Sequence, residues 1–396
     1  MTESYTMLLR TPQVPAVLGA GALARLPVGM YGLGLLFLAH ETTGSLGAAG
    51  AVGAAAGAGY AVVGPAFGRA ADRHGPVRPL LVATAVNACA FGVCLTVAAL
   101  TPSVWMLGAA AFLVGASIPP VASCQRALWP KLLDEQRRET ALALDSLQLD
   151  AFLILGPLLV TALSAVAGPA VAVGVTAVLI AVGTVVFAAL PACRTARPAG
   201  TKRGLGPLRS SGFLLLLATI AATGAALGVV RVSLIGFADA FGDASWGGVL
   251  YTAIGIGSAL GGLWYGSRSW SAPVERRYVV LLALYGACVL PLLAGTGTAL
   301  MFGLAILTGI ALTPATIGEF ALIGRCAPAA TVTEAFAWAT TATFAGNAAG
   351  TGAGGWLVQH VHWRAGIVVA ATLLLIAAVA ALWRIDLLRP RTPLPS

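Results

Sequence analysis

The chain has 396 residues, of which 58% are hydrophobic and 9% are charged, and its mean hydropathy is +0.90. Because soluble domains carry roughly a quarter charged residues, this composition excludes a soluble globular protein and indicates an integral membrane protein. The net charge of +9 is therefore interpreted through its placement along the chain and not as a sign of nucleic-acid binding.

Apolar stretches long enough to span a membrane recur from Val14 to Trp383. A spanning helix needs about 20 such residues, and the stretches predict about 12 of them. In chain order they cover 13–39, 46–66, 79–100, 104–127, 141–165, 168–191, 211–238, 245–266, 277–297, 299–324, 332–357 and 363–384. The runs are continuous and do not alternate, so a β-barrel is excluded and an all-α membrane fold is expected.

Lysine and arginine gather in every second connection, which sets the orientation. Both termini and the central loop are therefore expected in the cytoplasm, and the start of the chain lacks the pattern of a removable signal peptide. High alanine and glycine content with few lysines suggests a bacterial inner membrane. The basic residues on the expected cytoplasmic side are Arg10, Arg69, Arg73, Arg78, Lys131, Arg137, Arg138, Arg194, Arg197, Lys202, Arg203, Arg209, Arg268, Arg276, Arg277, Arg325, Arg384, Arg389 and Arg391.

The long polar interruption near the middle of the chain is basic and rich in glycine and proline. It predicts a cytoplasmic loop over 192–210 between two six-helix bundles, 1–191 and 211–396. The two halves also match at an offset of 194 residues, which aligns Pro120 with Pro314 and Gly68 with Gly262. The offset also aligns Gly156 with Gly350. It predicts two parallel repeats related by an axis along the membrane normal.

The segment "GRAADRHGPVRPL" lies between the second and third expected helices. It resembles the loop motif of the major facilitator superfamily, and the expected helices, central loop and repeat extend this resemblance over the whole chain. The resemblance implies alternating access by two bundles around a central site. The motif is expected to form a conformational latch, mainly in the N-terminal half because Gly266 replaces the acid in the second copy. Its residues are Gly68, Asp72, Arg73, Gly75 and Arg78.

Ionisable residues inside the membrane are costly and each needs a partner, a water-filled cavity or a function. Arg25 in the first expected helix and Asp150 in the fifth lie at similar depth, so we predict that they form an ion pair and that Asp145 points elsewhere. An aspartate beside a movable arginine can exchange that arginine for a proton, although a permanent structural pair remains an alternative. Glu319 in the tenth helix is expected to be a second proton site.

Other candidates concern the substrate. Arg25 and Arg231 favour an anionic group, but they lie 19 and 11 residues from the outer turns at Gly44 and Gly242 and so differ in depth. Glu334 is expected to cap its helix or to pair with Arg325. Further residues that could line a pocket, by resemblance to the family fold, are Tyr31, Glu319, Trp338, Phe344 and Asn347.

Gly156 and Pro157 retain part of the helix-five motif of drug-exporting family members, whereas the further glycines of that motif are missing after Pro157. No nucleotide-binding loop, metal site or catalytic motif occurs, so neither an enzyme nor a cofactor is expected. The sequence thus predicts a monomeric, proton-coupled exporter of small organic molecules in the bilayer. The alternatives are uptake or facilitated diffusion of a sugar or organic anion, and a non-transporting sensor or lipid-handling protein.

Overall fold

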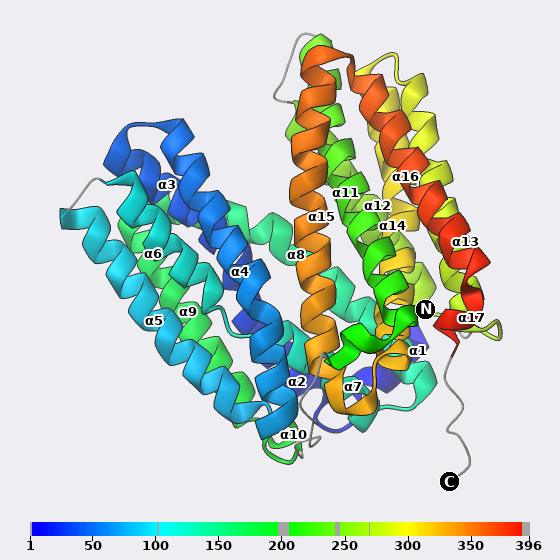
Figure 1. Ribbon diagram of the computed structural model, residues 1–396, viewed down its shortest axis with the longest axis horizontal. Helices are drawn as coiled ribbons and strands as arrows, with labels where there is room; N and C mark the ends of the chain where they lie inside the picture. Colours follow the sequence, from blue (N-terminus) through cyan, green and yellow to red (C-terminus); the bar gives the residue numbers. More distant parts are fainter. Residues whose placement is uncertain (1, 101–102, 197–205, 242–245, 269, 390–396) are drawn as a thin grey trace.

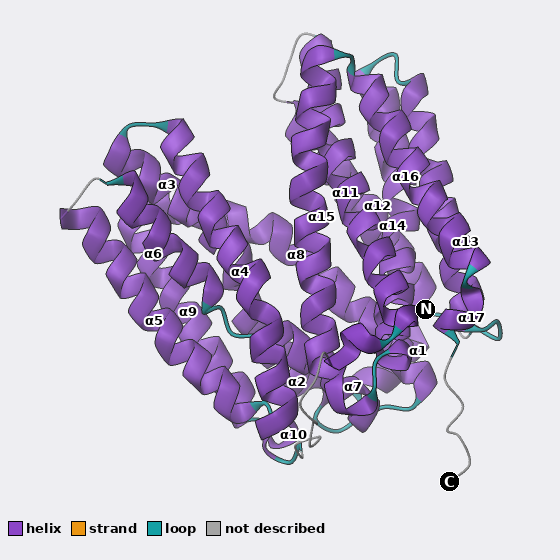
Figure 2. Ribbon diagram, in the orientation of Figure 1, coloured by secondary structure: helices purple, strands orange, loops and turns teal. Residues whose placement is uncertain are grey.

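The protein is an assembly of long helices in the computed structural model, which describes residues 2–100, 103–196, 206–241, 246–268 and 270–389. Within these residues every regular element is helical, as Figure 2 shows. The first half contains α1 (Thr2–Leu9), α2 (Val14–Arg25), η1 (Leu26–Gly29), α3 (Tyr31–Thr43), α4 (Leu46–His74), α5 (Val77–Leu100), α6 (Val104–Ala116), α7 (Val121–Leu132), α8 (Glu135–Ala167), α9 (Pro169–Ala189) and α10 (Pro191–Arg194).

The second half repeats the pattern of long helices. It contains η2 (Gly206–Arg209), α11 (Ser211–Ala240), α12 (Trp246–Gly266), α13 (Val274–Val289), η3 (Leu290–Ala294), α14 (Thr298–Cys326), η4 (Ala329–Thr331), α15 (Val332–His360), α16 (Trp363–Trp383) and α17 (Ile385–Leu388). Most of the expected central loop, 197–205, lies outside the described residues, as do residues 242–245.

Each of the expected spans is recovered as a helical segment, and the all-α membrane fold is confirmed. In the described chain, 11 helical segments are long and apolar enough to cross a membrane. The expected span at 332–357 is present as α15, which has 29 residues but is not among the 11, because its glycine and threonine residues lower its mean hydropathy.

Three expected spans are interrupted at prolines, of which the ninth passes from α13 into η3 at Pro291. The first is divided into α2, η1 and α3 around Pro27, and the fourth is divided into α6 and α7 at Pro119 and Pro120. Proline removes a backbone donor and disfavours the helical conformation in the residue before it, so a tandem pair ends the helix. The single Pro314, which the repeat aligns with Pro120, stays inside continuous α14.

The helices form two groups that diverge from one end of the molecule (Figure 1). Helices α2 to α9 form one group and α11 to α16 form the other, while α8 packs against both α9 and α12. The groups meet at the end that contains the last turns of α4 and α12 and the first turns of α8 and α15. We call this the closed end; α1 and α17 also lie there (Figure 1).

Within each group, small residues let helix backbones touch. A Cβ atom added at Gly350 of α15 would lie 2.0 Å from the carbonyl oxygen of Ala225 in α11, and one at Gly115 of α6 would lie 1.8 Å from that of Ala56 in α4. Such close crossings supply the packing that holds helices together in lipid, where the hydrophobic effect does not draw them together. The structure therefore uses glycines such as Gly350 and Gly115 as interhelical contact surfaces, whereas other glycines face open space.

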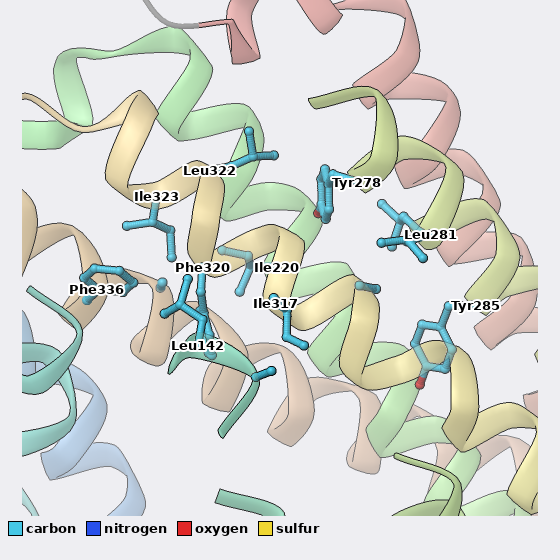
Figure 3. Packing of buried hydrophobic residues seen from close by; sticks show 14 of the residues in the cluster. Leu142, Ile220, Tyr278, Leu281, Tyr285, Ile317, Phe320, Leu322, Ile323 and Phe336 are labelled. Carbon is cyan, nitrogen blue, oxygen red and sulfur yellow. The ribbon is translucent and has the colours of Figure 1, made fainter. Parts of the chain in front are cut away.

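Large apolar side chains fill the interior of both groups. Tyr278 and Tyr285 of α13 and Phe320 of α14 belong to one buried cluster, which also includes Leu142 of α8 (Figure 3). Through Leu142, this cluster joins α8 to the second group near the closed end.

Candidate functional site

A cavity of about 410 Å³ lies where α8 of the first group faces α11, α12 and α14 of the second. This volume is within the range of small-molecule sites, which are mostly apolar with a few polar groups. Its lining residues are Asp150, Ile154, Pro157, Leu158, Leu227, Tyr251, Thr252, Ile254, Gly255, Ser258 and Leu312. The cavity is thus an apolar chamber with one carboxyl group in its wall.

Asp150 contacts the opposite group through that carboxyl group. Its Oδ2 atom accepts hydrogen bonds from the hydroxyl of Ser258 at 2.7 Å and from that of Thr313 at 3.3 Å, and the two hydroxyls also contact each other. Within the described residues no cationic side chain pairs with Asp150. A carboxylate in this setting can reduce the cost of its charge by binding a proton or by receiving a cationic group.

The expected ion pair between Arg25 and Asp150 is wrong, because Arg25 pairs with Asp145. Its Nη1 atom lies 2.5 Å from Asp145 Oδ1, and both side chains are buried. Five residues separate the two aspartates, which turns them about 140° apart on α8. Asp145 consequently faces the interior of the first group, whereas Asp150 faces the second.

Two residues that the sequence analysis overlooked complete this buried cluster. The Nε atom of Arg126 lies 2.7 Å from Asp145 Oδ2, and Gln125 donates to Asp145 Oδ1 at 3.0 Å. The guanidinium of Arg126 also lies 3.9 Å from the ring centre of Phe320 in the second group. The sequence feature that could have identified them is the proline pair at 119 and 120. These prolines end α6, so α7 takes a new direction and places Gln125 and Arg126 in the protein interior.

Glu319 lies away from the cavity. It is 3% exposed and accepts hydrogen bonds from the Thr223 hydroxyl at 2.9 Å and from the Tyr278 hydroxyl at 3.5 Å. These partners belong to α11 and α13, so the carboxyl group is enclosed within the second group.

Arg231, a predicted substrate residue, contacts a residue of the cavity lining. Its guanidinium carbon is 5.0 Å from the ring centre of Tyr251, which lines the cavity. Arg25 is occupied by Asp145, so the two arginines do not face one shared site.

The other predicted pocket residues lie outside this lining. Phe344 makes an edge contact with Tyr60 at 5.5 Å between ring centres, and Asn347 donates to the Gly224 carbonyl at 3.5 Å. Tyr31 and Trp338 are half-buried against the apolar clusters of the first and second groups, respectively.

At the closed end, the predicted latch residues of α4 contact the start of α15. Asp72 accepts hydrogen bonds from the backbone N–H groups of Thr333 at 3.1 Å and Glu334 at 2.9 Å. Arg69 lies 2.6 Å from Glu334. Asp72 thereby caps α15 from another helix, where the helix dipole favours a negative charge. We call this set of contacts the first clasp.

The glycines of the motif make this approach possible. A Cβ atom at Gly68 would lie 2.9 Å from the Cα atom of Glu334, and Gly75 adopts a φ of +78°. Arg73 is half-buried and Arg78 is exposed. Glu334 pairs with Arg69, whereas the expected alternative partner, Arg325, contacts Glu135 and Glu275.

A second clasp joins α8 to the end of α12 and the start of α13. Glu139 lies 2.5 Å from Arg277, and the Thr140 hydroxyl donates to the carbonyl of Gly266 at 3.0 Å. The expectation of a charge latch mainly in the N-terminal half was therefore too narrow. Gly266 has no acidic side chain, but an ion pair beside it supplies the corresponding charge contact.

The helix-five motif also serves a packing role. A Cβ atom at Gly156 would lie 2.5 Å from the carbonyl carbon of Gly29, so η1 and α8 touch through their backbones. Pro157, the next residue, lines the cavity.

Comparisons with known proteins agree with this architecture. The family model of the Major Facilitator Superfamily matches residues 17–269 and 216–396. No curated protein sequence matches the chain.

Solved structures with a similar fold include a bacterial homologue of the iron transporter ferroportin in an outward-facing state, with a TM-score of 0.77, 14% identity, and coverage of 94% of this chain and 99% of that one. The Escherichia coli fucose:proton symporter FucP has a TM-score of 0.73 and 12% identity over 95% of this chain and 99% of its own. A human organic anion transporter has a TM-score of 0.69 and 14% identity over 93% of this chain and 99% of its own. At these identities the likeness concerns the fold alone.

Proposed function

Since the chain belongs to the Major Facilitator Superfamily, we propose that it is a secondary active transporter that exports small organic molecules in exchange for protons. Two bundles, 1–191 and 211–396, rock about the cavity and are linked through 192–210. The partners are a small-molecule substrate, protons and the lipid bilayer, and the protein works as a monomer without a cofactor or metal.

The observation that carries this proposal is the placement of Asp150. Its carboxyl group lines the cavity and bonds to hydroxyls of the opposite group. Movement of the groups would change those hydrogen bonds, so proton binding at Asp150 and bundle movement are coupled through the same atoms. A carboxyl group placed between two conformations in this way is suited to proton coupling.

The orientation follows from the basic connections. Arg69, Arg277 and Arg325 lie at the closed end, which we place in the cytoplasm of a bacterial cell with both termini. The structure then corresponds to an outward-facing state, the state named for the bacterial ferroportin homologue. The clasps would hold this state until proton or substrate binding shifts the equilibrium.

Flux in proteoliposomes that contain a pH dye tests the proposal. A library of cationic, neutral and anionic molecules is added under an imposed pH gradient, and substrate-dependent proton movement is recorded. We expect Asp150→Asn to abolish this proton movement, whereas substrate exchange at equal pH should persist at saturating substrate. The matched control is Asp239→Asn, an exposed carboxyl near the end of α11, which should retain both activities.

Concentrative transport in the Asp150→Asn variant would overturn the assignment of Asp150 as the proton site.

Glu319→Gln belongs in the same assay because we propose Glu319 as a second proton site that becomes accessible during the cycle. A change in the number of protons per substrate in that variant supports two sites, and an unchanged ratio removes Glu319 from the coupling.

A second candidate function is uptake or facilitated diffusion of an organic anion or sugar. The contact of Arg231 with cavity-lining Tyr251 favours this alternative. Arg25 does not support it, because its guanidinium pairs with Asp145. Anion flux that is independent of the pH gradient and lost in Arg231→Gln would support this alternative. Ligand binding without any flux would instead indicate a sensor or lipid-handling protein.

A further inference from the structure

We propose that the cavity selects dipolar molecules in which a cationic group and an anionic group are joined by an apolar chain spanning about 10 Å. The inference rests on the proposed transport function and names its substrate class. The cation would meet Asp150, and the anion would meet Arg231.

The separation of the two charged groups follows from the positions of their contacts on α12. Asp150 bonds to Ser258, and Arg231 stacks on Tyr251. Both α12 residues line the cavity, and they are seven residues apart, which corresponds to two helical turns and about 10 Å along the helix axis. The carboxylate thus lines the chamber, and the guanidinium stacks on a lining ring two turns away along α12.

Arg231 is placed to receive an anion. It lies one turn after Leu227, a lining residue of the same helix, so the two side chains share a face of α11. The side chain is exposed, and within the described residues no carboxylate pairs with it. Stacking on Tyr251 fixes the guanidinium plane and leaves its N–H edge available for a carboxylate or phosphate.

The wall between the two charged groups is apolar. Leu158 of α8, Ile254 of α12 and Leu312 of α14 line it. A polar or charged central segment would lose its hydration there without gaining partners, whereas a methylene chain gains from burial. The chamber therefore favours a ligand whose polar groups are confined to its two ends.

Binding of ω-amino acids of graded length to the purified full-length protein tests this assignment by calorimetry at equal pH. We expect 8-aminooctanoate to bind about tenfold or more tightly than octylamine, which lacks the anion, or octanoate, which lacks the cation. 4-Aminobutanoate, which is too short to reach both groups, should lose the same advantage.

Two variants assign the ends. Arg231→Gln should remove the advantage over octylamine, and Asp150→Asn should remove the advantage over octanoate. Arg364→Gln is the matched control, because Arg364 likewise stacks on an aromatic ring, that of Trp363 at 4.6 Å, but does not approach the cavity lining. Arg231→Lys should restore part of the affinity, because it retains the positive charge.

Equal affinities for 8-aminooctanoate and octylamine, or an advantage that persists in Arg231→Gln, would overturn the inference. Because calorimetry needs no gradient, its outcome is separate from that of proton flux. Dipolar selectivity without proton flux would refute the proposed coupling alone, and proton flux driven by simple amines would refute the dipolar substrate alone.

Discussion

Asp145 accepts charge-assisted hydrogen bonds from two buried guanidinium groups, those of Arg25 and Arg126. Its side chain is fully buried, and Gln125 donates to the same carboxylate. Removing the shared acid would leave two cations without a counter-charge in a low-dielectric interior. The Asp145 carboxylate therefore has a structural role, whereas the Asp150 carboxylate is the one that lines the cavity.

Replacement of Asp145 by asparagine should lower the thermal unfolding midpoint strongly, because breaking a buried ion pair from one side costs about 3–5 kcal/mol. The measurement is thermal unfolding in detergent, followed by size-exclusion profiles. Asp239→Asn, at an exposed position, serves as the control. A wild-type melting curve for Asp145→Asn would contradict the shared-acid assignment.

The sequence alone does not show which of the two aspartates pairs with Arg25. Composition and depth were sufficient to identify Arg25 and Asp150 as intramembrane charges, but the choice of partner depends on rotation about α8. A helix whose small and apolar residues surround its whole circumference gives no periodic signal for which side faces the protein. Asp145 and Asp150 could not be distinguished without the positions of α2 and α12.

At the scale of helices, α11 and α15 touch through glycines whose space is already occupied by the neighbouring backbone. Gly350 faces the Ala225 carbonyl, whereas Gly352, two residues later, is exposed with no atom within 4 Å of an added Cβ. The sequence predicted the glycine-rich helix and its bounds to within a few residues. It could not predict which glycines are contacts, because that depends on the crossing angle.

This difference predicts opposite signs for two alanine substitutions. Gly350→Ala should destabilise the protein by about 1–3 kcal/mol through overpacking. Gly352→Ala should stabilise it by up to about 1 kcal/mol, because alanine favours a helix over glycine. Thermal unfolding of both variants in the same detergent checks the pair, and a shift of the same sign in both would refute the contact assignment.

For the whole molecule, the two clasps bridge the helix groups at one end, while the groups diverge toward the other (Figure 1). The twelve expected spans and the repeat were sufficient to predict the two-bundle family fold. They could not predict how far the bundles are separated. That separation depends on contacts at the two ends of the bundles, and the conformations that these contacts favour differ by only a few kcal/mol.

Weakening the first clasp should change that balance. Asp72→Asn removes the charge that caps α15, and a loss of about 1.4 kcal/mol would shift the ratio of conformations tenfold. Spin labels at Gly50→Cys and Trp356→Cys, near the diverging ends of α4 and α15, measure the separation in a background without native cysteines. We expect a new population at shorter distance.

Asp386→Asn is the control, because Asp386 forms an exposed pair with Arg389 within α17 and its neighbouring turn. Unchanged distance distributions in Asp72→Asn and in the double variant Asp72→Asn with Glu139→Gln would show that the clasps do not set the conformation.

The second clasp also explains how the C-terminal copy of the loop can lack an acid. Gly266 needs no carboxylate where Glu139 and Arg277 already join the same helix ends. Because two connections join the helix groups at the closed end, the loss of one leaves the other in place. We therefore expect the loss of both connections to shift the conformational ratio further than the loss of either one, a partial redundancy that arises from the duplicated architecture.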